Sequence, residues 1–216
     1  MNVDSARQQM IDQQVRAWDV FDPDVLAVLA SVPREQFVPA GYESLAFADT
    51  AIPIGHGESM LRPTIEGRLL QSLQLDGTER VLEVGTGTGF LAACLARLAD
   101  TVVSIDIYDD FLNQAGQNLE DTGIHNVEFI SMDATRELPE GHFDAIAVTG
   151  SIQEFDPRFV EALSIGGRLF VVVGDEPVME ARVVERTGDN DWQSETQFET
   201  CLEPLVHGSA PPGFLF

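Results

Sequence analysis

Apolar residues recur at two different spacings along the chain, and the spacing changes near residue 80. Before that point the apolar positions repeat every three or four residues, which is typical of amphipathic helices. Met10, Val15 and Trp18 lie on one face of a first predicted helix, and Asp4 or Ser5 is placed to cap it. The N-terminal third is therefore expected to be helical.

Two more helices are predicted before residue 80. Asp22 is suited to cap the first of them, because it precedes Pro23 and proline is favoured at the first helical position. Pro63 opens the second, which ends at Asp76 and Gly77. Between these two helices, the segment "AIPIGHGESMLRP" is interrupted by glycine and proline and is expected to form an irregular loop.

After residue 80, short apolar runs alternate with helical segments. The predicted strands are "RVLEV", "TVVSID", "VEFISMD", "FDAIAVTG" and "RLFVVVG", and the predicted helices are "FLAACLARLA", "DDFLNQAGQNLEDTG" and "PRFVEALSIGG". Uniformly apolar strands that alternate with helices predict a mainly parallel sheet with helices on both faces. The segments "EARVVERTG" and "QFETCLEPLV" predict a C-terminal antiparallel pair of strands around "DNDW".

These patterns predict one α/β domain over residues 1–216. Its parts are an N-terminal helical and loop region, 1–77, and a core, 78–216. The last residues, "GSAPPGFLF", are expected either to pack back as an arm or to fray.

The charge is strongly unbalanced, with 36 acidic residues against 12 basic ones and a formal net charge of −24. Every basic residue is an arginine. Such a chain should repel nucleic acid and anionic membrane surfaces, since both are bound through basic side chains. Two explanations stay open: a generic acidic surface that promotes solubility, or adaptation to a salty cytoplasm.

Localisation and redox state follow from the remaining composition. The chain has no apolar run of about 18 residues, and its first residues lack the apolar centre of a secretory signal, so we expect a cytoplasmic protein. Cys94 and Cys201 are then expected to be free thiols. No Cys/His spacing resembles a zinc site, and no metal is expected.

The segment "VLEVGTGTGF" places three glycines between an apolar strand and a helix. Glycines there allow the backbone to turn tightly and to approach a ligand closely. A dinucleotide-binding turn would have the spacing G-x-G-x-x-G, whereas Phe90 occupies the position of its last glycine. Glu83, just before the turn, would be unfavourable beside a pyrophosphate but suits a ligand with an amine and a cationic sulfur.

Two further acidic residues follow the next predicted strands. Asp106 ends "TVVSID", where it is placed to accept hydrogen bonds from ribose hydroxyls, and Asp133 in "SMDA" is placed to bind an adenine amino group. Together with the glycine turn, they indicate a pocket for S-adenosylmethionine.

The signature E-x-G-x-G-x-G resembles that of the class I S-adenosylmethionine-dependent methyltransferases over about residues 78–174. The resemblance implies a Rossmann-like fold. It also implies these cofactor-binding residues: Glu83, Gly85, Thr86, Gly87, Gly89, Asp106, Ile107, Asp133 and Ala134.

Nearly the whole chain resembles the protein-L-isoaspartate O-methyltransferase family, most clearly in "QQMIDQQVRAWDVFDPDVLAVLASVPREQFVP" and "ESLAFADTAIPIGHGESMLRP". The resemblance implies methylation of the free carboxylate of isoaspartyl residues in damaged proteins. It implies Ser59 as the catalytic residue, and as acceptor-binding residues Ile54, His56, Glu58, Ser59 and Arg62. A carboxylate is already a nucleophile at neutral pH, so this chemistry requires positioning rather than a general base.

The segment after Gly57 departs from the family pattern. Leu61 stands where that family has a serine, Glu58 replaces a neutral amide, and Arg62 is an unusual residue that could pair with the acceptor carboxylate. Two alternatives therefore stay open. One is a paralogue that methylates a small molecule or another protein carboxylate, and the other is an idle protein that only binds the cofactor.

Overall fold

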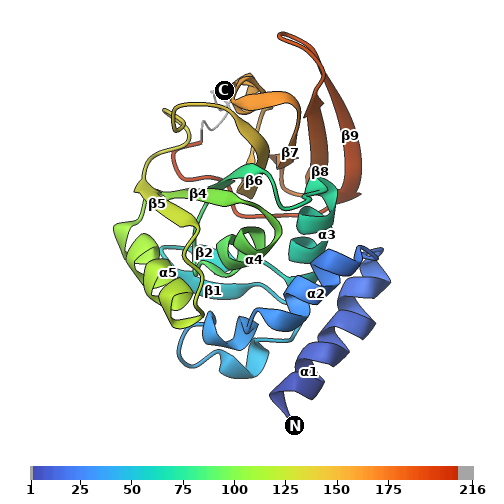
Figure 1. Ribbon diagram of the computed structural model, residues 1–216, viewed down its shortest axis with the longest axis vertical. Helices are drawn as coiled ribbons and strands as arrows, with labels where there is room; N and C mark the ends of the chain where they lie inside the picture. Colours follow the sequence, from blue (N-terminus) through green and yellow to red (C-terminus); the bar gives the residue numbers. More distant parts are fainter. Residues whose placement is uncertain (1, 209–216) are drawn as a thin grey trace, which may run out of the picture.

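A computed structural model describes residues 2–208, and its centre is a seven-stranded sheet of order β5-β4-β3-β6-β7-β8-β9 (Figure 1). Strands β5, β4, β3, β6 and β7 are parallel, whereas β8 and β9 add antiparallel to β7. The strands are β3 (Arg80–Val84), β4 (Thr101–Asp106), β5 (Val127–Ser131), β6 (Phe143–Ile152), β7 (Leu163–Asp175), β8 (Val178–Arg186) and β9 (Trp192–Glu199). The mainly parallel sheet and the C-terminal antiparallel pair are thus confirmed.

The helices begin largely at the residues that the sequence predicts. They are α1 (Val3–Met10), α2 (Pro23–Ser31), α3 (Pro63–Leu73), α4 (Phe90–Leu98), α5 (Asp109–Asp121) and α6 (Pro157–Glu161). Asp22 caps α2 by accepting hydrogen bonds from the backbone N–H groups of Asp24 and Val25, at 2.9 and 3.2 Å. Its predicted role as N-cap is confirmed.

The expected cap of the first helix is wrong. Asn2 caps α1, because its side chain accepts a hydrogen bond from the backbone N–H of Asp4 at 3.2 Å. The helical path then continues through a π-helical turn, η1 (Ile11–Val15), and a 3₁₀ turn, η2 (Arg16–Trp18). Two short 3₁₀ turns follow later, η3 (Arg34–Gln36) and η4 (Glu43–Leu45).

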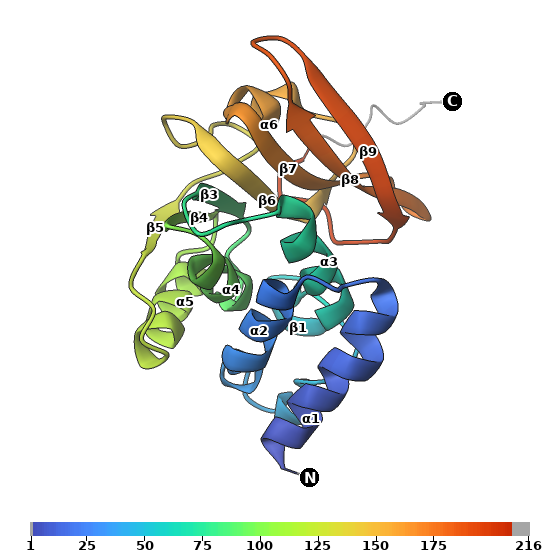
Figure 2. The same ribbon diagram turned by 45° about the vertical axis from the view of Figure 1, so that its right-hand side comes forward.

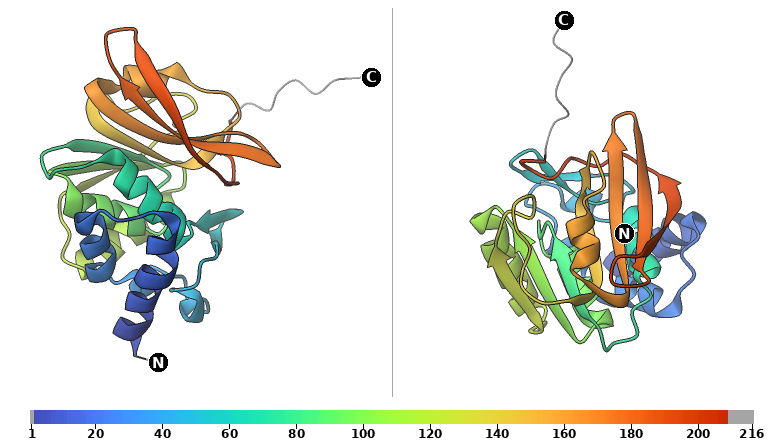
Figure 3. Two further views of the ribbon diagram at one scale, coloured as in Figure 1. Left: turned by 90° about the vertical axis from the view of Figure 1, so that its right-hand side faces the viewer. Right: turned by 90° about the horizontal axis from the view of Figure 1, so that it is seen from above.

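The sheet is covered on both faces, as expected, but unequally. One face packs against α3, α4, α5 and the N-terminal helices in a large apolar cluster. These helices lie below the sheet in Figure 2 and in the left view of Figure 3. The other face packs against the short helix α6 and neighbouring loops in a smaller cluster. The alternation of side chains along each strand supplies both clusters, as in Leu82 and Val84 on one face of β3 and Val81 on the other.

Several predicted boundaries are wrong. The helix that opens at Pro63 ends at Leu73 rather than at Asp76 and Gly77, and the last strand begins at Trp192 rather than at Gln197. The helix expected to run to Gly166 and Gly167 ends at Glu161, because Leu163 already pairs with Phe143 of β6 and belongs to β7. The last strand ends at Glu199, so "CLEPLV" lies beyond it. The final eight residues of the predicted C-terminal arm, 209–216, lie outside the described residues.

The segment expected to be an irregular loop forms a β-hairpin instead. Strand β1 (Ile52–Gly55) pairs antiparallel with β2 (Glu58–Met60). Gly55, His56 and Gly57 all have positive φ angles, of 112°, 54° and 87°. The two glycines adopt this left-handed region at little cost, so the residues that interrupt the pattern are those that allow the tight turn. We call residues 52–61 the acceptor hairpin.

No described helix has the length and apolarity needed to cross a bilayer. Cys94 is buried in α4 and Cys201 is exposed, and both are free thiols, as expected.

Candidate active site

A cavity opens at the carboxyl ends of β3, β4, β5 and β6, and the acceptor hairpin forms its other wall. Ligands bind at this edge of open α/β sheets. The described lining residues include five carboxylates and no basic side chain; the acidic ones are Glu58, Glu66, Asp106, Asp133 and Glu203.

The glycine turn forms the floor of the cavity. Gly85 and Gly87 line it together with Thr86, and both glycines have positive φ angles, of 94° and 51°. A Cβ on Gly85 would lie 2.1 Å from Thr149 Oγ1, and one on Gly87 would lie 3.1 Å from Ile54 Cδ1. Here glycine is required both by the backbone conformation and by the close approach of neighbouring side chains.

Gly89 has a different role in this structure. It is outside the cavity lining and forms the N-cap of α4, with a φ of 81°. A Cβ there would lie 2.8 Å from the Cβ of Ala115. The third glycine therefore lets α4 and α5 pack closely, and its predicted contact with the cofactor stays a prediction.

Glu83 lies beneath the turn and is fully buried. One carboxylate oxygen accepts a hydrogen bond from Ser104 Oγ, which in turn lies 2.7 Å from Thr86 Oγ1, while the other oxygen is buried without a hydrogen-bonding partner among the described residues. Burial, together with the nearby charge of Asp106, raises the pKa of Glu83 to about 8, although the hydrogen bond from Ser104 opposes the rise. Glu83 thus supports Thr86 from below the cavity.

Asp106 lines the cavity at the end of β4. Its carboxylate accepts hydrogen bonds from the backbone N–H of Gly87 at 3.2 Å and of Tyr108 at 3.0 Å. Burial raises its pKa, while these backbone hydrogen bonds partly oppose the effect. The contacts link the glycine turn to the segment after β4, where Ile107 also lines the cavity.

Asp133 and Ala134 line the cavity in the loop after β5. One oxygen of Asp133 accepts hydrogen bonds from the N–H and the hydroxyl of Thr135, at 3.0 and 2.6 Å, and the other lies 2.9 Å from His207 Nδ1. Burial acts to raise the pKa of Asp133, but the hydrogen bonds from Thr135 and His207 outweigh it, so the pKa is lowered.

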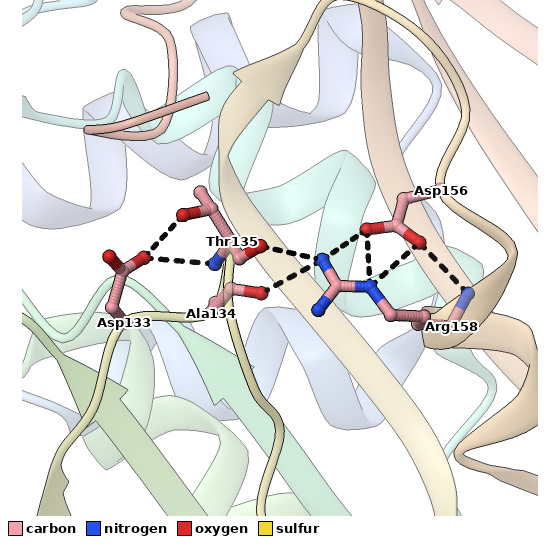
Figure 4. A network of polar contacts seen from close by, with 5 residues as sticks. All are labelled: Asp133, Ala134, Thr135, Asp156 and Arg158. Carbon is pink, nitrogen blue, oxygen red and sulfur yellow. Dashed lines mark hydrogen bonds and ion pairs between the residues drawn. The ribbon is translucent and has the colours of Figure 1, made fainter. Parts of the chain in front are cut away.

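Arg158 holds the same loop from the side of α6 (Figure 4). Its Nη2 donates to the carbonyl oxygens of Thr135 at 2.9 Å and Ala134 at 3.4 Å, and to the Asp156 carboxylate at 2.5 Å. The paired guanidinium fixes the backbone path of the loop that carries Asp133.

The acceptor hairpin brings most of its predicted residues to the cavity. Ile54, Glu58 and Ser59 line it, as do Met60 and Leu61. Ser59 faces Pro53 across the hairpin in the register of the two strands, and its hydroxyl has no protein partner within residues 2–208. A free hydroxyl in this wall is suited to hydrogen-bond an acceptor group.

Glu58 adds negative charge to the acceptor end. It is half-buried, and burial together with the charges of Glu203 and Asp106 raises its pKa, while His56 opposes the rise. Glu58 and Glu203 therefore lie close enough to repel each other, on two segments that meet at this end of the cavity.

His56 and Arg62 are the two predicted acceptor-binding residues outside the cavity lining. The His56 ring stacks on Tyr108 with centroids 3.9 Å apart, and its Nε2 lies 2.9 Å from the Asp110 carboxylate. Arg62 donates to Thr200 Oγ1 at 3.2 Å. The polar contacts of both side chains within the described residues are therefore with Asp110 and Thr200 rather than with Ser59.

Sequence reasoning missed two parts of the wall. Thr149, at the end of β6, lines the cavity and donates to the carbonyl oxygens of Val84 and Gly85, at 2.9 and 3.0 Å. The rule that ligands gather at the carboxyl ends of strands could have found it. The second part is Glu203–Val206, which is held beside β6 by backbone hydrogen bonds of Ser151 to Glu203 and Leu205, both at 2.8 Å. No local sequence pattern predicts the contact of this segment with β6.

No three potential metal ligands converge anywhere within residues 2–208.

Comparison with known proteins identifies the family. Residues 5–210 match the family model of protein-L-isoaspartate(D-aspartate) O-methyltransferase. The chain belongs to this family. It is 36% identical to protein-L-isoaspartate O-methyltransferase 2 of Pelobacter propionicus over 207 residues, which cover 95% of this chain and 92% of the relative. It is 39% identical to the Methanoregula boonei enzyme, with 84% of each chain covered.

Solved structures agree with this assignment. The chain superposes with a TM-score of 0.78 on a beta-aspartate methyltransferase from Plasmodium falciparum that was solved with S-adenosyl-L-homocysteine; the two are 21% identical, and the match covers 95% of this chain and 98% of that one. A protein-L-isoaspartate O-methyltransferase structure gives a TM-score of 0.79 at 25% identity, with 92% and 65% covered. These two structures show that the chain has the family's fold, and the family match shows that it is an O-methyltransferase of this family.

Proposed function

We propose that the protein transfers a methyl group from S-adenosylmethionine to the free carboxylate of isoaspartyl residues in proteins and peptides. The observation that carries the proposal is that one cavity joins the glycine turn and Asp106 to the acceptor hairpin with Ser59. Family membership supplies the reaction type. We place this activity in the cytoplasm, and we propose neither nucleic acid nor a membrane as a partner, since the chain carries a net charge of −24.

The described residues suit the cofactor. Gly85 and Gly87 leave space where side chains would collide, and Asp106 and Asp133 supply acceptors for hydroxyl and amino groups. When bound, S-adenosylmethionine supplies a methyl group on a cationic sulfur. Glu66 is paired with Arg34, but the other lining carboxylates give the cavity a negative potential that favours a cation of this kind.

The role of this chain's residues toward the acceptor is positioning. An ionised carboxylate needs no base, so the acceptor hairpin must orient one oxygen and exclude water. The Ser59 hydroxyl is proposed to donate a hydrogen bond to the acceptor carboxylate. Leu61 presents an apolar side chain where the family pattern has a serine, and so contributes shape and water exclusion only.

The test is transfer of labelled methyl groups to a short isoaspartyl peptide, with the aspartyl peptide of the same sequence as control. We expect methylation of the isoaspartyl peptide alone. Ser59→Ala should lower kcat/KM about tenfold, as expected for loss of one hydrogen bond to a charged group. Ser194→Ala, which alters an exposed serine of β9, is the matched control. Wild-type protein that binds S-adenosylhomocysteine yet leaves the isoaspartyl peptide unmethylated would contradict the proposal.

The acidic acceptor end favours a second candidate, methylation of another acceptor. Glu58 and Glu203 face a site that would have to receive an anion, and no basic side chain is among the described lining residues. A screen of peptide digests and small-molecule extracts with labelled cofactor distinguishes the candidates. A product whose methyl group survives the mild alkali that hydrolyses carboxyl methyl esters would favour the second.

A further inference from the structure

Arg34 is a fully buried charged side chain in the segment between α2 and the acceptor hairpin. It begins the 3₁₀ turn η3, its exposed fraction is 0%, and it lies outside the cavity lining. A buried guanidinium must use its donors, because unpaired charge in the interior is costly. Arg34 uses them on three different segments of the chain.

The partners of Arg34 converge on the acceptor end of the cavity. Its Nη2 donates to the carbonyl oxygen of Leu61 at 2.7 Å, its Nε donates to that of Ala46 at 2.9 Å, and its Nη1 pairs with the Glu66 carboxylate. Its guanidinium carbon also lies 4.7 Å from the centroid of the Phe90 ring. Leu61, Glu66 and Phe90 all line the cavity, so three of these four contacts end on its wall.

These contacts link the acceptor hairpin to the start of α4, and the reaction requires these two walls of the cavity to keep a fixed relative position. Leu61 closes the acceptor hairpin that carries Ser59, whereas Phe90 begins the helix after the glycine turn. The guanidinium is planar and holds its donors in a fixed fork, so it sets direction as well as distance. A lysine at this position would keep the charge but lose the simultaneous contacts with Leu61, Ala46 and Glu66.

The ion pair with Glu66 is part of the same arrangement. Glu66 lies in the first turn of α3 and is 2% exposed; burial raises its pKa and the charge of Arg34 opposes that rise. Removing one partner alone would leave a buried charge, while replacing both by apolar side chains of similar volume is often tolerated. Replacing both residues of the pair can therefore preserve stability while it tests whether the pair fixes the position of the acceptor hairpin.

We propose that Arg34 is a positioning residue that fixes the acceptor hairpin against the start of α4 and thereby aligns Ser59 with the cofactor end of the cavity. The inference deepens the proposed function, on which its activity readout rests. Arg34 acts through the Leu61 carbonyl and touches no reacting group.

The experiment compares Arg34→Lys and the double variant Arg34→Met/Glu66→Leu with wild type. Glu66→Gln keeps the shape of the pair, and Arg97→Lys, in an exposed position of α4, is the matched control. Three quantities are measured: amide hydrogen exchange of residues 52–61 and 85–90, the Kd for S-adenosylhomocysteine, and kcat and KM for the isoaspartyl peptide.

We expect faster exchange in the acceptor hairpin, because the Leu61 carbonyl loses its partner, and unchanged exchange in residues 85–90, because Arg34 contacts only the ring of Phe90 there and no backbone group. We also expect a Kd within about twofold of wild type and a kcat/KM lowered at least about tenfold in both Arg34 variants. A purely structural role would instead move both segments and the cofactor affinity together. Hairpin exchange and kcat/KM equal to those of wild type in the folded double variant would overturn the proposal. If wild type methylates no isoaspartyl peptide, the proposed function fails, and the exchange data alone then decide the role of Arg34.

Discussion

Replacing Glu83 by glutamine should stabilise the ligand-free protein at alkaline pH and weaken its cofactor binding. Burial raises the pKa of Glu83 from its ordinary value of 4.5 to about 8, so the folded state holds the proton that the unfolded state releases. Stability from this group is therefore fully present below pH 4.5 and is lost as pH rises through about 8. Glutamine stays neutral throughout and avoids this loss.

The size of the effect follows from the pKa difference. One pKa unit corresponds to about 1.4 kcal/mol, so the two pKa values give a wild-type loss of about 3 kcal/mol between pH 5 and pH 8. Glutamine can still accept the hydrogen bond from Ser104, so the substitution changes charge more than packing.

The assay is urea unfolding of both proteins at several pH values from 5 to 8.5. Other buried carboxylates, such as Asp106, titrate in both proteins, so the difference between the two curves isolates Glu83. We expect the advantage of Glu83→Gln to grow with pH. A difference that stays constant across this range would refute the assignment of a protonated Glu83. Calorimetry tests the expected role of Glu83 in cofactor binding. The affinity of the wild-type protein for S-adenosylhomocysteine should rise toward pH 8.5, because an ionised Glu83 favours a ligand with an amine, and the affinity of the variant should not rise.

Three further outcomes are expected. Gly85→Ala should weaken cofactor binding at least about tenfold, because its Cβ would lie 2.1 Å from Thr149 Oγ1. Gly123→Ala is the control for backbone strain, since Gly123 has a φ of 67° and a Cβ there would meet nothing within 4 Å. Equal effects of the two substitutions would contradict the steric argument. Arg158→Lys should raise the cofactor Kd severalfold while KM for the acceptor stays constant, as measured by calorimetry and steady-state kinetics. Raising KCl from about 0.1 to 1 M should increase both Tm and kcat/KM for an anionic peptide, since screening at a Debye length of roughly 3 Å relieves a net charge of −24; flat curves would count against adaptation to salt.

The cofactor end could be predicted from the sequence because its determinants are local. A glycine turn requires particular φ angles at neighbouring positions, and the acidic residues that follow β4 and β5 reach one sheet edge as soon as the strands are parallel. Gly85, Thr86 and Asp106 accordingly line the cavity. Gly89 shows the limit of this reasoning, since the same pattern does not distinguish a glycine that meets a ligand from one that meets Ala115.

The acceptor end could be predicted only in part, because pairing across the chain determines it. The glycines of the acceptor hairpin interrupt the strand pattern, yet they are what allows β1 and β2 to pair. Glu203 reaches the cavity through backbone contacts with Ser151 of β6, which is 52 residues away along the chain. Neither the pairing of β1 with β2 nor the contact of Glu203 with Ser151 produces a periodic pattern of apolar residues, so neither could be predicted from a short window of sequence.

This difference explains why the two ends of the cavity tolerate substitution to different degrees. The cofactor end depends on backbone geometry, and the positive φ angles of Gly85 and Gly87 restrict most substitutions there. The acceptor end depends on side chains whose support comes from buried partners such as Arg34 and Glu66, and charge can be exchanged there without change of fold. Glu58 replaces a neutral amide by a carboxylate, and Leu61 replaces a hydroxyl by an apolar side chain. We therefore expect the acceptor of this protein to depend on how firmly the hairpin presents Ser59 among the lining carboxylates.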